Sequence, residues 1–569
     1  MTYRRGRSIP SRRGVRVLSA CAIAALALVC LLPAGSHAAT APSKFPKGFM
    51  WGIGGSPGFQ SEMGQGRFRD TNSDWWAWTH DRENINSGTV SGDLPENGPG
   101  GWADNFATDI NNARKLGLGA WRMGIEWSRI FPRSTASVKI GSSVSRADLR
   151  ALDRLADRSA VQRYGEIIRA VRKAGMKPFM VINTYTLPLW IHDPIAMRDA
   201  LASRGADDPV PTGLKKSGWL SPETVTEYRK YAAYLAWKFG GLVDWWVPLN
   251  EPMVNAIYGY GNIPGAFAGN FPPGALSYES AILALEHMAD ANAAAYDEVH
   301  SKDRRDADRS PSQAWVGRSL RAARVGLIHN LIHFTPTDPM READVVATEH
   351  AEQVFNRLFP DAAIKGIFDR NGNGVVDPGE TEPEMADKAD FYGVNYYFRG
   401  RVTGLGFPLS SAIPLLDFLP SVGYRWDGNP TGPLCPTVCS DFGAEIDPDG
   451  LGVALREAAE YGKPIIVTEN GLADKEDDLR PRFLVEHLKQ VAQAARARPN
   501  GVPVLGWFEW NLTDNYEWAA GFTPKFGLYS FNPRTLKRTP RRASVNVLSR
   551  ITRANAIPGD LLDRFGGSG

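Results

Sequence analysis

Short apolar runs alternate along this chain with longer stretches in which apolar residues recur at helical spacing. Runs of about four to eight apolar residues that alternate with amphipathic helices are typical of parallel βα units. We expect helices at residues 104–116, 160–174 and 224–239. The eight apolar runs predict eight parallel strands that close into a barrel, at residues 49–53, 120–125, 178–182, 243–249, 325–328, 391–395, 464–467 and 504–510.

Polar and charged side chains follow or end several of these runs. Glu126 follows the second run, Glu251 the fourth and Glu469 the seventh, and Asn395 ends the sixth. In a (β/α)8 TIM barrel, the C-terminal ends of the strands form the active site. The sequence therefore predicts an α/β fold with a single TIM barrel, in which these side chains share one face. The segments after the first and sixth strands are long, and we expect them to be active-site loops.

Two glutamates in short motifs indicate the chemistry. Glu251 lies in Asn250-Glu251-Pro252, and Glu469 lies in Thr468-Glu469-Asn470-Gly471. Cleavage of a glycosidic bond requires one protonated carboxyl group and one ionised carboxylate. Arg122, at the end of the second strand, is a candidate cation to keep one glutamate ionised, while that negative charge raises the pKa of the other. The pair therefore predicts cleavage of glycosidic bonds.

The first 38 residues have the pattern of a secretory signal peptide. An arginine-rich start precedes an apolar run at residues 17–32, and Ser36-His37-Ala38 forms a small-residue cleavage pattern. The apolar run is short for a membrane span, so we expect no stable membrane anchor after cleavage. The sequence thus predicts a signal peptide at 1–38, a barrel domain at 39–569, and a secreted, extracellular protein exported by the Sec or the Tat route.

Removal of the leader changes the net charge and the number of cysteines. It holds six of the 65 basic residues and none of the 62 acidic ones, so the mature chain has a small net negative charge. No nucleic-acid partner is indicated. Cys21 and Cys30 leave with the leader, and Cys435 and Cys439 remain. In an exported protein this pair favours a disulfide, with two free thiols as the alternative, because so short a ring can be strained.

Further motifs occur along the chain in a fixed order, and together they support the interpretation of the glutamate pair. From about Phe45 to Ser549 the chain resembles glycoside hydrolase family 1, the retaining β-glycosidases, and especially its archaeal branch. The motifs that carry this resemblance are Gly58-Phe59-Gln60-Ser61-Glu62, residues 91–100, Glu126-Trp127-Ser128-Arg129-Ile130-Phe131-Pro132, Asn395-Tyr396-Tyr397, and Asp514-Asn515-Tyr516-Glu517-Trp518.

The resemblance implies a role for each matching residue. Glu251 would be the acid/base, and Glu469 the nucleophile that forms a covalent glycosyl intermediate. The substrate would be a small-molecule or oligosaccharide β-glycoside, and catalysis would need no cofactor. The implied substrate-binding residues are Asn250 at the sugar 2-hydroxyl, Arg122 and Tyr397 beside Glu469, Gln60, Glu517 and Trp518 at the other hydroxyls, and Trp510 as the stacking floor.

One position departs from the family pattern. The family normally has His-Trp after the third strand, where this chain has Thr184-Tyr185. A hydroxyl cannot span the gap that an imidazole spans to the 3-hydroxyl, so a water, a substituent or a different sugar could fill it. Two other interpretations are that Asn183 takes over the contact or that the change is neutral. The departure leaves the preferred sugar open.

Two other functions use the same features. A transglycosylase would share both glutamates and transfer the glycosyl group to an acceptor other than water. A sugar-binding pseudoenzyme would bind a glycoside without turnover, and the missing histidine motivates this alternative.

A second motif fits a calcium-binding loop. Oxygen-bearing residues and glycines recur with the spacing of a 12-residue calcium loop between residues 369 and 380. The alternative is a polar, glycine-rich turn. The motif precedes strand six, which places a structural Ca2+ on the stability face of the barrel. The candidate ligands are Asp369, Asn371, Asn373, Val375, Asp377 and Glu380.

Overall fold

The computed structural model describes residues 40–567 except positions 57, 102–104, 206–207, 212, 262–269, 309–321, 408–417 and 422–436. The predicted signal peptide and Cys435 lie outside the described residues. Pro42–Gly569 form one compact unit. Within the described ranges, no helix is long and apolar enough to cross a membrane. Cys439 is disulfide-bonded.

The predicted barrel is confirmed. One sheet holds nine parallel strands in the order β6-β5-β4-β3-β2-β13-β12-β9-β7. They coincide with the eight apolar runs, because the fifth run is divided between β6 and β7. The strands are β2 Met50–Ser56, β3 Ala120–Gly124, β4 Lys177–Asn183, β5 Trp245–Leu249, β6 Arg324–Val325, β7 Leu327–Asn330, β9 Tyr392–Asn395, β12 Ile465–Asn470 and β13 Val504–Glu509.

The fifth strand closes the barrel and is broken at Gly326. A β-carbon on Gly326 would lie 2.4 Å from the ring of Phe391, so only glycine lets the strand pass this ring. The backbone of Gly326 donates to the carbonyl of Trp246 over 2.9 Å. Beyond the break, Asn250 pairs with Ile328, and the backbone N–H of Glu251 donates to the Ile328 carbonyl over 3.2 Å. Asn250 and Glu251, which follow β5, thus close the barrel by pairing with β7.

Side chains fill the inside of the barrel as a separate apolar cluster. Phe179 lies at its centre, with ring centroids 5.1 Å from Phe508, 5.6 Å from Phe391 and 5.9 Å from Trp245. Alternate residues of each strand point inward because strand side chains have a period of two. The barrel is therefore a packed core. Its buried members are Met50, Ala120, Phe179, Val181, Trp245, Val247, Ile328, Phe391, Ile466 and Phe508.

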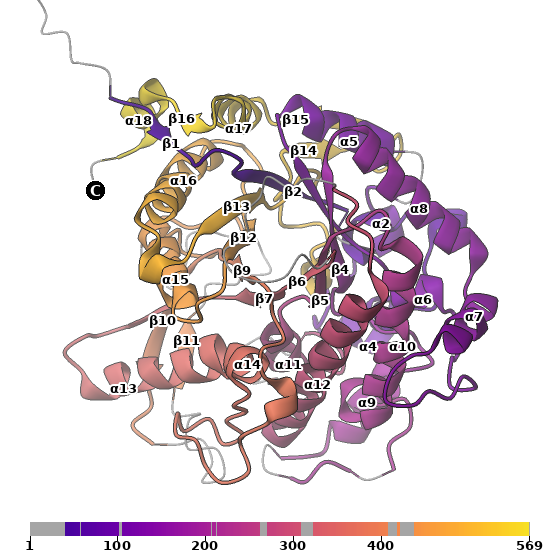
Figure 1. Ribbon diagram of the computed structural model, residues 1–569. Coiled ribbons are helices and arrows are strands. Elements are labelled where there is room, and N and C mark those ends of the chain that lie inside the picture. The colour runs from indigo at the N-terminus through magenta and orange to yellow at the C-terminus, as the bar shows by residue number, and fades with distance from the viewer. Residues whose placement is uncertain are drawn as a thin grey trace, which may run out of the picture. The chain divides into compact units, whose positions relative to one another are not determined.

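Amphipathic helices surround the strands (Figure 1). The three predicted helices form at α5 Phe106–Lys115, α8 Arg158–Lys173 and α10 Pro222–Phe239. Helix α8 begins where the Asp157 side chain accepts the backbone N–H groups of Ser159 and Ala160, as N-cap residues do. The remaining large helices are α12 Tyr278–Lys302, α13 Glu342–Ala351, α15 Pro448–Ala459, α16 Arg480–Ala497 and α17 Arg542–Ala554.

Shorter elements connect and cover the barrel. The long segment after β2 contains α2 Phe59–Glu62, α3 Asp74–His80 and α4 Arg82–Asn86. The short strands pair as β1 Ser43–Lys44 with β16 Ala556–Ile557, and β14 Tyr529–Phe531 with β15 Arg538–Pro540. The other short helices are α6 Trp127–Ile130, α7 Arg146–Leu155, α9 Pro194–Leu201, α11 Pro252–Tyr260, α14 Leu358–Pro360 and α18 Gly559–Phe565.

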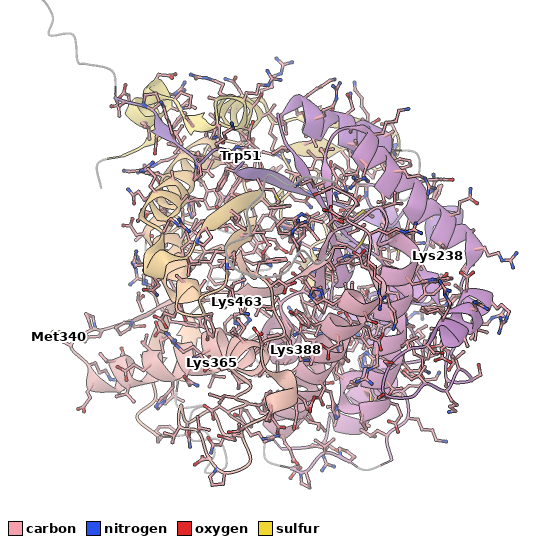
Figure 2. The ribbon with its side chains drawn as sticks, in the orientation of Figure 1. Trp51, Lys238, Met340, Lys365, Lys388 and Lys463 are labelled. Carbon is pink, nitrogen blue, oxygen red and sulfur yellow. The ribbon has the colours of Figure 1, made fainter. Side chains whose placement is uncertain are left out.

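A small sheet beside α13 was not predicted. Its strands are β8 His333–Pro336, β10 Arg399–Gly404 and β11 Phe418–Ser421. Strands β8 and β10 are short and follow β7 and β9 closely, so their apolar pattern merges with the preceding run. The segment between β8 and α13 carries Met340, which is 90% exposed and projects from the molecule (Figure 2).

The interior cluster yields a stability prediction. Replacing Phe508, which is fully buried, with alanine leaves a cavity among Phe179 and its neighbours. We expect a loss of about 3–5 kcal/mol in the free energy of unfolding, measured by denaturant titration. The matched control is Phe407→Ala, because Phe407 is 62% exposed and its loss should change stability by less than about 0.5 kcal/mol. Equal effects in the two variants would contradict the packed interior.

Candidate active site

Glu469, at the end of β12, lies in a buried ion pair. Its Oε1 is 2.5 Å from Nη1 of Arg122, which projects from β3 and is 1% exposed. The hydroxyl of Tyr397 donates to the other oxygen, Oε2. Burial, followed by the charge of Glu469, raises the pKa of Tyr397 far above its usual value, so the phenol remains a donor. Glu469 thus has a buried guanidinium at one oxygen and a phenol donor at the other.

The second branch of the Arg122 guanidinium reaches the end of β5. Its Nη2 donates to Oδ1 of Asn250 over 2.7 Å. Arg122 therefore joins Glu469 to the residue that precedes Glu251. Both Glu469 and Asn250 are at least nine-tenths buried. Because guanidinium is planar and carries donors in a fixed fork, this contact fixes the two strand ends relative to each other.

Glu251 begins α11 in an unusual backbone conformation. Its φ of 46° lies in the left-handed region, and Pro252 follows at the first helical position. The carboxylate receives three donors. Asn395 Nδ2 donates to Oε1 over 2.6 Å, while the Tyr185 hydroxyl and, over 3.4 Å, Asn250 Nδ2 donate to Oε2. A non-glycine residue in this region is costly and must be held by its surroundings.

The two glutamates differ in electrostatic environment. Burial, and then the negative charge of Glu469, raises the pKa of Glu251 to about 7. The hydrogen bonds from Tyr185 and Asn395 and the charge of Arg122 oppose this rise. Glu469, in contrast, pairs directly with Arg122. The arrangement can therefore hold one carboxyl group that gives and takes a proton near neutral pH, beside one carboxyl group that pairs with a cation.

A second polar group lies where the predicted sugar-binding residues meet. Gln60 Nε2 donates to Oε2 of Glu517 over 3.4 Å, and Asn515 Nδ2 donates to the same oxygen over 2.7 Å. Burial raises the pKa of Glu517 to about 8, and the charges of Glu469 and Glu251 add to this effect. Side chains that can form hydrogen bonds with sugar hydroxyls thus lie near the two glutamates.

Indoles form part of the wall. The guanidinium carbon of Arg122 lies 5.5 Å from the centroid of the Trp510 ring. Trp518 has a φ of 50° and packs against Tyr185 and Trp75, with ring centroids 5.0 and 4.6 Å apart. The structure therefore brings the predicted residues that lie at the ends of β2, β3, β5, β9, β12 and β13, or just after them, to one end of the barrel.

Thr184 is buried in the loop after β4. The side-chain amide of Asn183 forms hydrogen bonds within the same loop. Its Nδ2 donates to the Thr186 carbonyl over 2.7 Å, and its Oδ1 accepts from the Tyr185 backbone over 3.1 Å. Both ends of the Asn183 amide are therefore used inside the loop.

Three residues of the site had no assigned role in the sequence. Asn395 and Glu126 were singled out as polar residues at strand ends and as members of motifs, and Tyr185 only as a neighbour of Thr184. Glu126 accepts from the Phe59 backbone over 2.7 Å and from the Thr186 hydroxyl over 2.6 Å. It thus ties the loop that carries Gln60 to the loop that carries Thr184.

The predicted calcium loop lies between the helical segment after β8 and β9. Asp369 accepts backbone N–H groups of Asn373 and Gly374, over 3.1 and 2.8 Å. The amides of Asn371 and Asn373 both donate to Oδ2 of Asp377, over 2.8 and 2.9 Å. Glu380 accepts from the Arg370 and Asp377 backbones. Val375, whose carbonyl was the remaining candidate ligand, is 60% exposed.

These loop residues do not gather as a preformed metal cluster. Across the described part of the chain, no three or more His, Cys, Asp or Glu side chains are grouped so that they could hold a metal ion. The helix that precedes the loop starts at Glu342 and continues as a π-helical stretch, Glu352–Arg357.

The chain is similar to known proteins over most of its length. The profile of "Glycosyl hydrolase family 1" matches residues 41–195 and 209–556. A β-galactosidase of Pyrococcus woesei is 40% identical over 532 residues, which cover 90% of this chain and 98% of that protein. A β-galactosidase of Sulfolobus acidocaldarius is 38% identical, over 91% of this chain and 96% of that one.

A solved structure agrees with these matches. The β-glycosidase of the hyperthermophile Thermosphaera aggregans superposes with a TM-score of 0.76 at 37% identity, over 91% of this chain and 99% of that one. The expected similarity to the archaeal branch is confirmed.

The charge coupling between the two glutamates can be tested directly. Glu469→Gln removes a negative charge that raises the pKa of Glu251. We expect the Glu251 carboxyl to titrate at lower pH in this variant than in the wild type, as followed by 13C NMR of labelled glutamate side chains. Glu251→Gln identifies the resonance, and Glu349→Gln on the exposed face of α13 is the control. An unchanged midpoint would rule out the coupling.

Proposed function

Because this chain belongs to glycosyl hydrolase family 1 and is a retaining β-glycosidase, we propose that it hydrolyses O-β-glycosides with Glu251 as acid/base and Glu469 as nucleophile. One observation carries this assignment of roles. Arg122 pairs with Glu469 at 2.5 Å, whereas the pKa of Glu251 is raised to about 7. The carboxylate beside the cation suits attack, and the carboxyl group that exchanges a proton near neutral pH suits acid/base work.

In the first step, an oxygen of Glu469 bonds to the anomeric carbon while the bond from that carbon to the leaving oxygen breaks. The proton of Glu251 moves to the leaving oxygen, so the aglycone departs as a neutral alcohol. Negative charge leaves Glu469 when it becomes an ester. The pKa of Glu251 then falls, because a charge that raised it has gone.

In the second step, ionised Glu251 takes a proton from water. The water oxygen bonds to the anomeric carbon, and the ester bond to Glu469 breaks. The anomeric configuration is inverted twice and so retained overall. The negative charge returns to Glu469, where the Arg122 guanidinium pairs with it. The contact between Arg122 and Asn250 keeps both strand ends in place throughout the cycle.

The sugar-binding assignment follows the same geometry. We assign Asn250 to the 2-hydroxyl, Gln60, Glu517 and Trp518 to the other hydroxyls, and Trp510 to the apolar face of the ring. The hydrogen bond between Gln60 and Glu517 and the contact between Arg122 and Trp510 support this assignment. We assign Thr184 to specificity, since neither its short side chain nor the engaged amide of Asn183 replaces an imidazole. We expect gluco, galacto, fuco, manno and furanosyl donors to be discriminated at this side of the ring.

The site of action follows from the first 38 residues. Their arginine-rich start, apolar run and Ser36-His37-Ala38 pattern support export, and cleavage there would release the barrel domain without an anchor. The disulfide at Cys439 suits an oxidising compartment.

The two roles predict different variant phenotypes. Glu469→Ala should abolish turnover of aryl β-glycosides, because no covalent intermediate forms. Glu251→Ala should lower kcat on glycosides with poor leaving groups by about 10²–10⁴-fold. Azide should restore part of its activity on activated aryl glycosides and give a β-glycosyl azide, since azide needs no base and attacks the esterified sugar. The measurements are steady-state kinetics over the donor panel and product analysis by NMR.

Each rival has a distinct outcome in the same assay. Products dominated by disaccharides or alkyl glycosides at low acceptor concentration would establish a transglycosylase. Absence of turnover of every donor by the wild type would establish a sugar-binding pseudoenzyme. Azide rescue of Glu469→Ala in place of Glu251→Ala would exchange the two roles.

We also propose that residues 369–380 bind a structural Ca2+. Asp369 and Glu380 are buried, and the side chains of Asn371, Asn373 and Asp377 converge by hydrogen bonds. Carboxylate, amide and carbonyl oxygens are ligands that suit a hard cation, and rotation of the two amides would turn their oxygens inward. The loop lies before β9, so the ion would stabilise the fold and take no part in catalysis.

Calcium should therefore raise the melting temperature without changing the kinetics. At about 100 times the Kd, the stabilisation is about 2.7 kcal/mol. Differential scanning calorimetry with and without a chelator measures this, and elemental analysis gives the bound ion. Glu380→Gln should lose the response, and Glu349→Gln should keep it. Identical melting curves with and without calcium, together with no bound calcium, would remove the proposal.

A further inference from the structure

We propose that Tyr185 is the positioning residue that holds the acid/base carboxyl group of Glu251 in both of its protonation states. This inference rests on the proposed function. Tyr185 stands where the family normally has a tryptophan, and its hydroxyl contacts Oε2 of Glu251.

The amide partners of Glu251 donate to its oxygens in both states but cannot accept its proton. The Asn395 and Asn250 contacts are both made through amide nitrogens, which only donate. They stabilise the ionised carboxylate but offer no acceptor to a carboxyl proton. A phenol hydroxyl donates to the carboxylate and, after turning about its C–O bond, accepts from the protonated acid. An indole N–H at this position could only donate.

The surroundings hold the Tyr185 ring in place. Its φ of 68° lies in the left-handed region, and its backbone N–H is held by Asn183 Oδ1 at 3.1 Å. The ring packs against Trp518 and Phe271, with centroids 5.0 and 5.2 Å away. Since the ring is fixed, the hydroxyl proton is the part of Tyr185 that is free to move between states.

The hydroxyl proton of Tyr185 acts against the charges that surround Glu251. Glu469 faces Glu251 with a negative charge, whereas Arg122 is a nearby cation and Tyr397 stays neutral. Burial, and then the charge of Glu251, raises the pKa of Tyr185 far above its usual value, so the phenol keeps its proton. Tyr185 therefore offsets repulsion when Glu251 is ionised, which is the state needed to activate water.

Tyr185→Phe tests this role, because phenylalanine keeps the ring and removes only the hydroxyl. The ionised form of Glu251 loses a charge-assisted hydrogen bond, so its pKa should rise. The basic limb of the pH profile of kcat/KM reports that pKa in the free enzyme. We expect the limb to move upward by about one pH unit. We also expect a lower kcat for activated aryl glycosides, where hydrolysis of the intermediate limits the rate, and recovery of that step with azide.

The matched control is Tyr234→Phe. Tyr234 also donates to a carboxylate, Asp153 Oδ1 at 2.7 Å, but on the helical layer away from the site. Its variant should keep the wild-type pH profile. An active Tyr185→Phe enzyme with an unmoved basic limb would overturn the positioning role while leaving the hydrolase intact. Retained activity of Glu469→Ala would instead overturn the proposed function.

Discussion

The site depends on one buried guanidinium. Arg122 contacts Glu469 through one nitrogen and Asn250 through the other, and so joins three barrel strands. A buried charge of this kind is costly unless its partners are fully formed. Removing Glu469 would leave an unpaired ion in the core. The separation of charge between Glu469 and Glu251, and the relative position of β5 and β12, follow from this contact.

Backbone strain is concentrated around the same glutamate. Glu251, Tyr185 and Trp518 all have φ values between 46° and 68°. Each such residue costs about 1–3 kcal/mol and persists only where packing holds it. Here the rings of Tyr185 and Trp518 pack against each other, and Glu251 is held by Asn395 from β9. The barrel thus supplies the stability that keeps the carboxyl group in position.

The local pattern of apolar residues predicted the barrel strands, because each strand is a short apolar run. The positions of Glu251, Glu469 and Arg122 at strand ends identified them as candidate catalytic groups. Motif resemblance added Gln60, Glu517 and Trp510. The roles of Tyr185 and Asn395 were not predictable, because their hydrogen bonds join residues far apart in sequence and depend on a left-handed backbone. Strands β8, β10 and β11 were missed because their pairing is set by tertiary contacts beside α13.

Closure of the barrel has a consequence for inactivation. The backbone of Glu251 donates to Ile328, and Asn250 pairs with the same residue, across the seam between β5 and β7. The fifth strand is interrupted at Gly326, so this seam has fewer ladder contacts than its neighbours. We expect heating to part this seam and displace Glu251 before the helices melt, so that turnover is lost before helical signal.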